Sequence, residues 1–594
     1  MKKVVSVSLF VLFSFAVKAQ YASLLANAHA RKFQSLNGKW EVIIDPFNVG
    51  AGNGKAVWKD QKPTGKYDFY EYGFVPSKTL QVPGDWNHQK PQLTYYEGTV
   101  WYKKTFLHKP DKTKRTFLYF GAVNYQCDVY FNNQYLGSHE GGFTPFQFEI
   151  TGKLKDTNSV IVRVNNRRKP ENIPAMNFDW WNYGGITRDV SLIETPVNYI
   201  KDYNVQLAKN SFDTISGNIE VAGNNLSEPV SVNIPQLNLN YHTTTGNDGK
   251  AFFKIAAKPH LWSPADPKLY DVIISSPTDT VHEMIGFRTI QVKGTEILLN
   301  GKPVFLKGVN IHEEIPQEKR RAYSEADAEM LLKWAKDLGC NFVRLTHYPH
   351  NEYMVRLADK WGIMLWEEVP LWQNIQFSNP EILNKADTML KEMITRDKNR
   401  CSIIMWSLSN ETSPSVDRNK TLTAMAGYVR SLDSTRLVTS ALNHVRYDGN
   451  TITIDDSLCK VLDVVGVNEY LGWYVPWPAK PENMVWENPY NKPLIMSEFG
   501  AEAKYGQHGS ADTNGFWAEE RQAQVFKDQI TMFKNIPFLR GTCPWILADF
   551  RSETRLQPIY QQGWNRKGLL SDKGQKKQAW FVMHDYYKHI RNSY

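Results

Sequence analysis

The chain has 594 residues, of which 42% are hydrophobic and 22% are charged, enough apolar material for several large buried cores. Such a composition is typical of a soluble globular protein and excludes disordered, collagen-like and coiled-coil chains. The formal charge of +9 is spread along the sequence without a long run of Lys or Arg, so no nucleic-acid partner is expected.

The N-terminal residues 1–19 have the pattern of an export signal. Two lysines precede an apolar stretch, and Val17-Lys18-Ala19 is a cleavage site of the small-residue type. We expect cleavage after Ala19 and an exported protein, either periplasmic or secreted. Cleavage removes three lysines and lowers the formal charge from +9 to +6. No later apolar run reaches the ~20 residues of a transmembrane helix, so no membrane partner is expected after cleavage.

The cysteines form no CxxC pair, and their number is odd. A chain of this size can stabilise itself by burial, so we expect buried thiols and no disulfide framework, even after export. The sequence also lacks HExxH, GxSxG and Walker A patterns, and no His, Asp or Glu cluster has metal-ligand spacing. Neither a metal nor another cofactor is expected. The cysteines are Cys127, Cys340, Cys401, Cys459 and Cys543.

Two consecutive stretches read as β-sandwiches. From about residue 36 to 194, short alternating apolar runs broken by turn residues predict strands near 101–106, 127–131 and 159–164. Residues 198–291 continue in strands, near 217–221, 230–234 and 269–274. The length of this second stretch, roughly 90 residues, fits a small immunoglobulin-like sandwich.

After about residue 292 the pattern changes to alternating helices and strands. Ser324 is expected to cap a helix whose apolar residues recur at helical spacing, with Gly339 as its stop signal. The alternation then repeats over about 300 residues, which favours a closed (β/α)8 TIM barrel, with an open doubly wound sheet as the alternative. Strands are expected at 341–345, 363–366, 403–406, 464–467, 494–496 and 541–545, and helices near 352–361 and 380–397.

In such a barrel, functional side chains project from the carboxyl ends of the strands. Two carboxylates facing each other across the mouth have the arrangement of glycoside hydrolysis, with a separation of about 5 to 5.5 Å in retaining enzymes. Trp and Tyr at the same rim can stack on a sugar ring. Polar side chains at strand ends also serve as caps and ion-pair partners, so the pattern alone leaves both interpretations open. The candidates are Arg344, Thr346, His347, Glu367, Glu368, Asn410, Glu411, Asn468, Tyr470, Glu498 and Trp545.

Several motifs, in the right order, resemble glycoside hydrolase family 2 over nearly the whole mature chain. The stretches 285–288, 299–303 and 307–313 resemble the signature at the start of its barrel, and 36–40 and 140–146 its N-terminal jelly-roll domain. Residues 396–411 are similar to its acid/base motif, and Ser497-Glu498-Phe499-Gly500 to its nucleophile motif. One departure is Arg400-Cys401, where the family usually carries His-Pro; it lies upstream of the catalytic strand end.

The resemblance implies a jelly-roll β-sandwich over residues 20–197, an immunoglobulin-like β-sandwich over 198–291 and the catalytic TIM barrel over 292–594. It also implies a retaining β-glycosidase in which Glu411 is the general acid/base and Glu498 the nucleophile. The acid must stay protonated near neutral pH, while the nucleophile must be ionised.

Contacts to the sugar follow from the same resemblance. Asn410 is expected to bind the 2-hydroxyl, a contact that strengthens in the transition state. Tyr470 or Tyr474 is expected to orient Glu498. For His312 and His347, a sugar contact and a structural hydrogen-bonded histidine remain equally open.

The spacing Asn565-Arg566-Lys567 is similar to the carboxylate-recognition motif of the β-glucuronidases within this family. A lysine ammonium and an asparagine amide suit a sugar C6 carboxylate. We therefore predict an exo-acting enzyme that hydrolyses terminal β-D-glucuronides. Further residues that align with positions around the sugar in those enzymes are Asp179, Asn468, Tyr474 and Trp545.

Three alternatives remain at this stage. The first is a β-galactosidase of the same fold acting on plant or algal oligosaccharides. The second is a non-catalytic carbohydrate-binding protein, against which the presence of both Glu411 and Glu498 argues. A metal-dependent hydrolase is the least favoured. The sequence leaves open whether the substrate is a glucuronide or a galacturonide, which polymer it comes from, and whether the chain forms a homo-oligomer.

Overall fold

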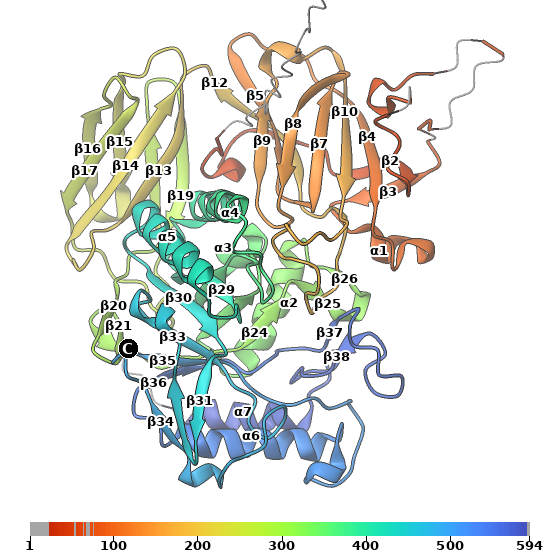
Figure 1. Cartoon of the computed structure of the whole chain (residues 1–594). Coiled ribbons are helices and arrows are strands. Elements are labelled where there is room, and N and C mark those ends of the chain that lie inside the picture. Colours follow the sequence, from red (N-terminus) through yellow and green to blue (C-terminus); the bar gives the residue numbers. More distant parts are fainter. Residues whose placement is uncertain (1–22, 53–54, 63–64, 67–71, 75, 591–594) are drawn as a thin grey trace, which may run out of the picture.

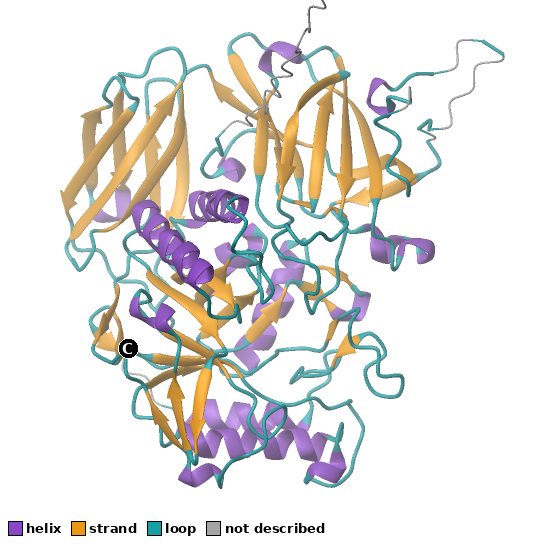
Figure 2. Ribbon diagram, in the orientation of Figure 1, coloured by secondary structure: helices purple, strands orange, loops and turns teal. Residues whose placement is uncertain are grey.

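The computed structural model describes residues 23–52, 55–62, 65–66, 72–74 and 76–590, so the predicted export signal lies outside the described residues. Two β-sandwiches lie side by side on top of a barrel in the view of Figure 1. The long helices are confined to the barrel part (Figure 2). Among the described residues, no helix has the length and apolar character needed to cross a membrane.

The first sandwich packs a four-stranded sheet against a six-stranded one. Its strands alternate buried and more exposed side chains, as in β7 (Gln126–Phe131), and the inward residues form one core that includes Trp40, Leu118 and Val129. In order across the sheets, the strands are β1 (Phe33–Ser35), β12 (Val190–Pro196), β5 (Lys114–Phe120) and β9 (Phe146–Glu149), then β3 (Thr79–Val82), β2 (Gly38–Asp45), β4 (Thr99–Leu107), β10 (Thr157–Asn165), β7 (Gln126–Phe131) and β8 (Gln134–Glu140). A short helix α1 (Trp86–Gln89) and the pair β6 (Val123–Asn124) and β11 (Gly185–Ile186) complete it.

The second sandwich is smaller and has the predicted immunoglobulin-like size. Its two sheets enclose a separate core around Tyr203, Val232 and Ile274. The strands are β13 (Tyr199–Leu207), β14 (Thr214–Ala222) and β17 (Lys250–Ala256) in one sheet, and β16 (Leu239–Thr244), β15 (Pro229–Ile234), β18 (Tyr270–Ser275) and β19 (Thr280–Ile285) in the other. The next strand, β20 (Ile290–Lys293), crosses the predicted domain boundary at 291/292 and pairs with β21 (Glu296–Leu299), which pairs with β22 (Lys302–Pro303).

The third part is a closed parallel barrel, as predicted. In the parallel sheet of the barrel, the first member is β23 (Leu306–Lys307) and the last is β24 (Asn310–His312). These two are pieces of one strand interrupted at Gly308 and Val309, so the sheet closes into a ring. In order, the strands are β23 (Leu306–Lys307), β36 (Leu539–Thr542), β35 (Leu494–Glu498), β33 (Val465–Asn468), β30 (Leu437–Leu442), β29 (Ile403–Asn410), β28 (Met364–Glu368), β27 (Phe342–Thr346) and β24 (Asn310–His312). The doubly wound alternative is therefore excluded.

The barrel helices lie outside the strands. Ser324 caps α2 through a capping box with Asp327, and Gly339 follows the helix with a φ of 92°, as its stop signal predicts. The long helices are α2 (Glu325–Asp337), α3 (Glu352–Trp361), α4 (Glu381–Asp397), α5 (Val416–Leu432), α6 (Glu519–Phe533) and α7 (Gln578–His589).

The predicted alternation of helices and strands differs from the structure between residues 437 and 494: the barrel strand β30 was not predicted, and the helical pattern expected between the strands at 464–467 and 494–496 is wrong. No α-helix follows β30 or β33 before the next barrel strand; a small sheet of β31 (Val445–Asp448), β32 (Thr451–Ile454) and β34 (Val485–Glu487) stands there instead. A turn at Gly449, with a φ of 59°, and the β-branched run after it favour a hairpin. After β33, prolines at 476, 478, 481, 489 and 493 break any helix.

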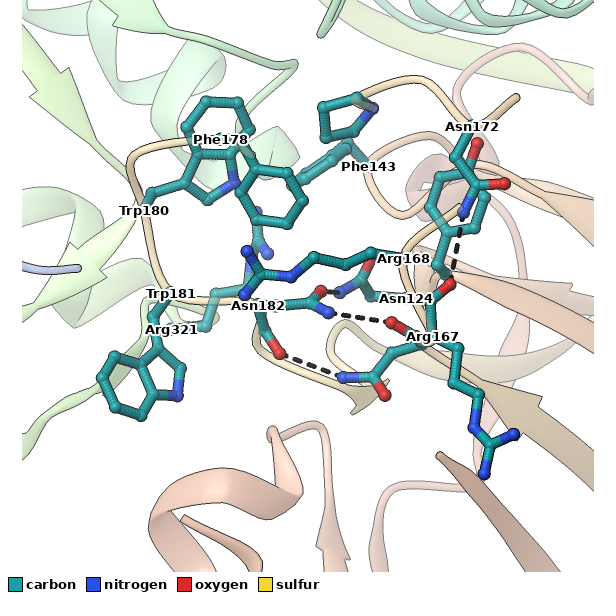
Figure 3. Close-up of a pocket in the computed structure, with 13 residues that line it drawn as sticks. Asn124, Phe143, Arg167, Arg168, Asn172, Phe178, Trp180, Trp181, Asn182 and Arg321 are labelled. Atoms are coloured by element: carbon teal, nitrogen blue, oxygen red, sulfur yellow. Dashed lines mark hydrogen bonds between the residues drawn. The ribbon is translucent and has the colours of Figure 1, made fainter. Parts of the chain in front are cut away.

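The first sandwich reaches the barrel mouth through residues 178–182. Within the sandwich, the Asn182 side chain bonds to Asn124 at 3.2 Å and to the backbone of Asn166 at 2.8 Å (Figure 3). The Asn182 backbone N–H donates to Glu553 of the barrel at 3.1 Å. The cavity drawn there measures only about 10 Å³, room for about one water molecule. The contact is thus a packed joint and not a ligand pocket. The cysteines are buried and free, as predicted.

Candidate active site

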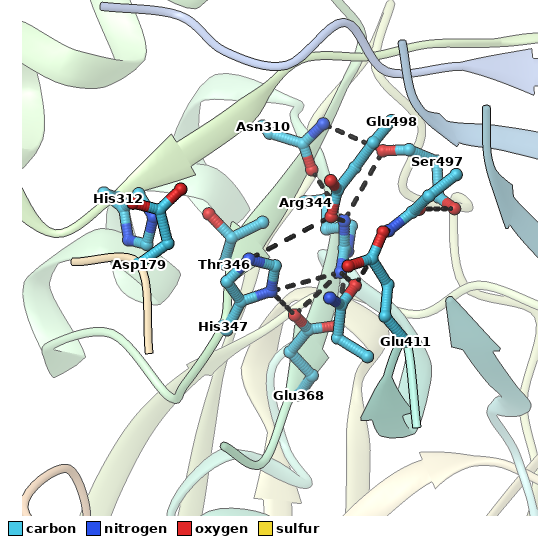
Figure 4. Close-up of polar contacts among 12 residues, drawn as sticks. Asp179, Asn310, His312, Arg344, Thr346, His347, Glu368, Glu411, Ser497 and Glu498 are labelled. Atoms are coloured by element: carbon cyan, nitrogen blue, oxygen red, sulfur yellow. Dashed lines mark hydrogen bonds and ion pairs between the residues drawn. The ribbon is translucent and has the colours of Figure 1, made fainter. Parts of the chain in front are cut away.

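Glu498 is the last residue of β35 and is almost fully buried. Its Oε1 accepts a hydrogen bond from Arg344 at 2.8 Å (Figure 4). Its Oε2 accepts one from the Tyr470 hydroxyl at 2.8 Å. Both oxygens are therefore fixed by donors. Tyr470, and not Tyr474, is the tyrosine that orients this carboxylate.

Arg344 lies beneath Glu498 and is fully buried, so its geometry favours a role in holding the nucleophile over the predicted sugar contact. Besides Glu498 it binds Glu368 through two atoms, at 3.0 and 3.2 Å, and the Asn410 side chain at 2.7 Å. A planar guanidinium suits several fixed acceptors at once. Glu368 also accepts from Trp366 at 2.9 Å, so the carboxylate behind Arg344 is itself anchored.

Glu411 follows β29 directly and is more exposed than Glu498. Its two oxygens accept hydrogen bonds from Asn468 at 3.0 Å and from Gln373 at 2.9 Å. Its backbone has a φ of 51°, a left-handed conformation that is unfavourable for a glutamate and that clusters at functional sites. The bond from its N–H to the Ala441 carbonyl, 2.8 Å, holds this conformation.

Asn410 and Asn468 connect the two carboxylates. The Asn410 side-chain oxygen accepts from Arg344 and, at 3.1 Å, from Asn468, whose other bond goes to Glu411. The amide nitrogen of Asn410 is buried and has no acceptor among the described residues. A buried donor without a partner is costly unless a ligand satisfies it, which fits the predicted bond to a sugar hydroxyl.

The charges of the site are coupled. Burial raises the pKa of Glu498 to about 8, and the negative charge of Glu411 adds to this, while the bonds from Arg344 and Tyr470 act in the opposite direction. The two donors therefore determine how easily Glu498 ionises.

One wall of the mouth is aromatic. The Trp545 ring stacks on His347 at a centroid distance of 4.9 Å and meets His312 edge-on at 5.4 Å. Trp180, from the first sandwich, lies 5.5 Å from His347. His347 also contacts Glu368 at 2.9 Å, and burial lowers its pKa below the usual range. His312 is buried, with the Tyr348 hydroxyl 3.1 Å from its Nδ1, while its Nε2 is buried without a hydrogen-bond partner among the described residues.

Lys567 is buried at the mouth, where its backbone carbonyl accepts a hydrogen bond from Ile546, the neighbour of Trp545. Its ammonium donates to the Tyr474 hydroxyl at 2.6 Å and to Glu502 at 3.1 Å, and it lies 5.8 Å from the centroid of the Tyr470 ring. The negative charge of Glu502 keeps the pKa of this lysine above its usual value in spite of burial. Lys567 thus reaches the tyrosine that holds Glu498.

Asp179 comes from the first sandwich and enters the same network. It forms an ion pair with Arg555 and accepts hydrogen bonds from Asn565 at 3.1 Å and Ser552 at 2.5 Å. The cations Arg555 and Lys567 hold its pKa below the usual range in spite of burial. The predicted residues Asp179, Asn565 and Lys567 are therefore brought together.

Sequence reasoning missed three residues of this site, Glu502, Arg555 and Gln373. Glu502 lies four residues after Glu498 and binds Lys567, and Arg555 lies 3.4 Å from Glu502. The only signal was an acidic residue just past the nucleophile strand and a basic one near the Asn-x-Lys motif. Neither indicates its partner, because the pairing depends on where the loops fold.

Two carboxylates at strand ends of a closed barrel, one tightly held and one more exposed, define the site of a glycoside hydrolase. The sequence models of glycosyl hydrolases family 2 match residues 33–196 (sugar binding domain), 198–288 and 290–592 (TIM barrel domain). The chain belongs to glycoside hydrolase family 2 and is a glycoside hydrolase.

Individual relatives cover nearly the whole chain. The β-glucuronidase of Rattus norvegicus is 28% identical over 95% of this chain and 92% of its own. The solved β-glucuronidase of Ruminococcus gnavus superposes with a TM-score of 0.81 at 25% identity, covering 96% of this chain and 100% of that one. A β-galacturonidase of Eisenbergiella tayi bound to galacturonate has a TM-score of 0.78 at 25% identity, covering 95% and 98%.

Proposed function

We propose that this protein is an exported, exo-acting, retaining β-glycosidase that removes terminal β-D-glucuronides from glycans or conjugates. The observation that carries the proposal is the buried ammonium of Lys567 next to Tyr470, which holds the nucleophile. A lysine ammonium has three donors, and two are used by Tyr474 and Glu502. The third is left for a substrate carboxylate.

The neighbouring cation Arg566 is committed elsewhere. Its guanidinium binds Asp572 at 2.8 Å, Asp549 at 3.2 Å and the Tyr560 carbonyl at 3.1 Å. Of the two cations in the Asn-x-Lys stretch, Lys567 is therefore the one that faces the mouth. The relatives named above, two β-glucuronidases and a β-galacturonidase, support a uronide as substrate class.

In the proposed mechanism, the Glu498 carboxylate attacks the anomeric carbon while Glu411 donates its proton to the leaving oxygen. A glycosyl ester on Glu498 results. Glu411, now ionised, takes a proton from water, and the resulting nucleophile breaks the ester with net retention. The orphan amide of Asn410 is placed to donate to the 2-hydroxyl, where its bond strengthens as charge develops at the anomeric carbon.

A panel of aryl β-glycosides tests the substrate class: glucuronide, galacturonide, galactoside and glucoside. We expect the glucuronide to be cleaved with the highest kcat/KM. A preference for the galactoside replaces this proposal with the β-galactosidase alternative, and no turnover on any of them favours the non-catalytic alternative. Proton NMR of the first product tests the mechanism, because an α-anomer from a β-glycoside contradicts retention.

Export is tested separately. We expect the protein to be found outside the cytoplasm with an N-terminus starting at Gln20, as determined by N-terminal sequencing. A protein retained inside the cell with Met1 intact contradicts this part of the proposal.

A further inference from the structure

A second cavity lies at the joint between the first sandwich and the barrel. It has a volume of about 400 Å³, in the range of small-molecule sites, and is formed by the region around α1 on one side and the barrel hairpin β37 (Phe550–Arg551) and β38 (Trp564–Asn565) on the other. The residues that carry its chemistry are Tyr95, Trp181, Lys319, Arg551 and Gln562; we call it the joint groove.

The joint groove lies behind the active site and is not part of it. In the hairpin, Phe550 pairs with Asn565 and Arg551 pairs with Trp564, so the two pairs face opposite sides. Phe550 contacts His312 of the active-site wall at a centroid distance of 4.4 Å, whereas Arg551 lines the groove.

The side chains of residues 178–182 also face two sides, one toward the active site and one toward the groove. The rings of Trp180 and Trp181 point to opposite sides of their segment (Figure 3). Trp180 joins the aromatic wall of the active site, and Trp181 lines the groove. The hairpin and this segment thus separate two sites that share their backbone.

The groove offers an aromatic surface and a free donor. The Tyr95 side chain is 74% exposed, and its ring lies 5.3 Å from that of Trp181. The indole N–H of Trp181 is buried and has no acceptor among the described residues. A flat exposed ring beside an unsatisfied hydrogen-bond donor suits a ligand with an apolar face and hydroxyl groups, as a sugar has.

The groove also contains cations without counter-ions. Arg551 is only 7% exposed, and its guanidinium carbon lies 3.2 Å from the Trp181 ring centroid. In the described part of the chain, neither Arg551 nor the exposed Lys319 forms an ion pair within 4 Å. Glu318, at the rim, is paired with Arg320 at 2.6 Å. Glu314 accepts a hydrogen bond from the Arg551 backbone N–H, and the charge of Arg551 opposes the rise of the Glu314 pKa that burial causes. Glu314 forms no hydrogen bond with the guanidinium, whose Nη1 lies 3.5 Å from the Lys319 carbonyl. A buried guanidinium that forms no ion pair within 4 Å favours an anionic ligand.

We propose that the joint groove is a second carbohydrate site that binds an acidic sugar unit of a glycan chain, with its ring on Tyr95 and its carboxylate or sulfate on Arg551. The site is distinct from the catalytic centre, and the inference does not depend on which terminal sugar the enzyme removes. The enzyme would then bind a polymeric glycan chain at two places.

The test uses the catalytically silent Glu498→Ala protein and isothermal titration calorimetry with β-1,4-linked tetraglucuronate. Cellotetraose is the matched neutral probe, since it has the same linkages without the carboxylates. We expect two binding events for the acidic probe. Arg551→Met and Tyr95→Ala should each weaken one event at least tenfold and leave the other unchanged, and Lys567→Ala should weaken only the other. Tyr95 is exposed, so its replacement does not put folding at risk.

In the otherwise wild-type enzyme, both groove variants should keep kcat/KM on a small aryl β-glycoside within twofold. A single binding event that Arg551→Met and Tyr95→Ala leave intact overturns the second site. Equal binding of cellotetraose overturns its acidic specificity. If the aryl panel disproves uronide cleavage while Arg551→Met still abolishes tetraglucuronate binding, the proposed function fails and the groove stands.

Discussion

Around Glu498 the polar partners come from a barrel strand and from the residues just after another, whereas around Lys567 they come from the loops beyond the strands and the network reaches another domain. Arg344 lies within β27, and Tyr470 lies two residues after the end of β33. The partners of Lys567 are Glu502 and Tyr474, and the network extends to Asp179 in another domain. The reaction centre is thus built into the barrel, and the proposed specificity region is assembled around it.

The largest expected effect separates the two carboxylates. Glu498→Ala should lower kcat by roughly five orders of magnitude, because no nucleophile remains. Glu411→Ala should regain activity with azide, or with an activated aryl leaving group that needs no proton. Steady-state kinetics with leaving groups of different pKa measure this. Similar responses of both variants to leaving-group pKa contradict the assigned roles.

A substitution in the proposed specificity region should abolish the preference for uronides while the reaction centre stays functional. Lys567→Ala is expected to lower kcat/KM on an aryl β-glucuronide by about two orders of magnitude or more, while weak glucoside or galactoside turnover stays nearly intact. Arg566→Ala is the matched control and should have a smaller effect, since its side chain points away from the mouth. An equal loss on uronide and neutral sugar in Lys567→Ala rules out carboxylate recognition.

Breaking the ion pair between Lys567 and Glu502 should lower the stability of the protein. Glu502→Gln leaves a buried ammonium without its counter-ion, and we expect the free energy of unfolding to fall by about 3 kcal/mol. Added glucuronate should stabilise this variant more than the wild type, because its carboxylate replaces the missing charge. Thermal denaturation with and without glucuronate measures both effects. The control Asp271→Asn, in an exposed pair with His282, should change stability by less than about 1 kcal/mol.

The smallest effect concerns the pH profile. Glu498 must be ionised to attack, so activity falls as the pH drops through its pKa, which burial raises to about 8. Tyr470→Phe removes a donor that favours the ionised form, so the acidic limb of kcat/KM should move to higher pH. A lost bond of about 1 kcal/mol corresponds to about 0.7 pH unit. A limb that stays in place, or moves to lower pH, contradicts the assigned role of Tyr470.

The sequence predicted the barrel and its polar strand ends because both follow from local pattern. Glu411 and Glu498 stand where a strand period ends, and the motifs around them are contiguous. The role of Arg344 beneath the nucleophile was missed, since a strand-end arginine reads equally well as a surface contact. Burial alone distinguishes the two.

The other site residues could not be predicted from the sequence, because their roles depend on tertiary pairing. Arg555 and Glu502 are ordinary charged residues in loops until the fold places them beside Asp179 and Lys567. The missing helices after β30 and β33 were foreseeable from the prolines between residues 476 and 493 and from the turn at Gly449. Those local signals were outweighed by the regularity of the repeats around them.

The ion pair of Asp179 with Arg555 joins residues 376 positions apart. During synthesis the first sandwich leaves the ribosome with this aspartate uncompensated, and its partner follows only near the end of translation. An excised barrel would lack one wall of its own mouth, and Arg555 would keep only its contact with Glu502 there. The two domains therefore depend on each other. If either domain is replaced by the corresponding domain of a related protein, residues 179 and 555 must be exchanged together.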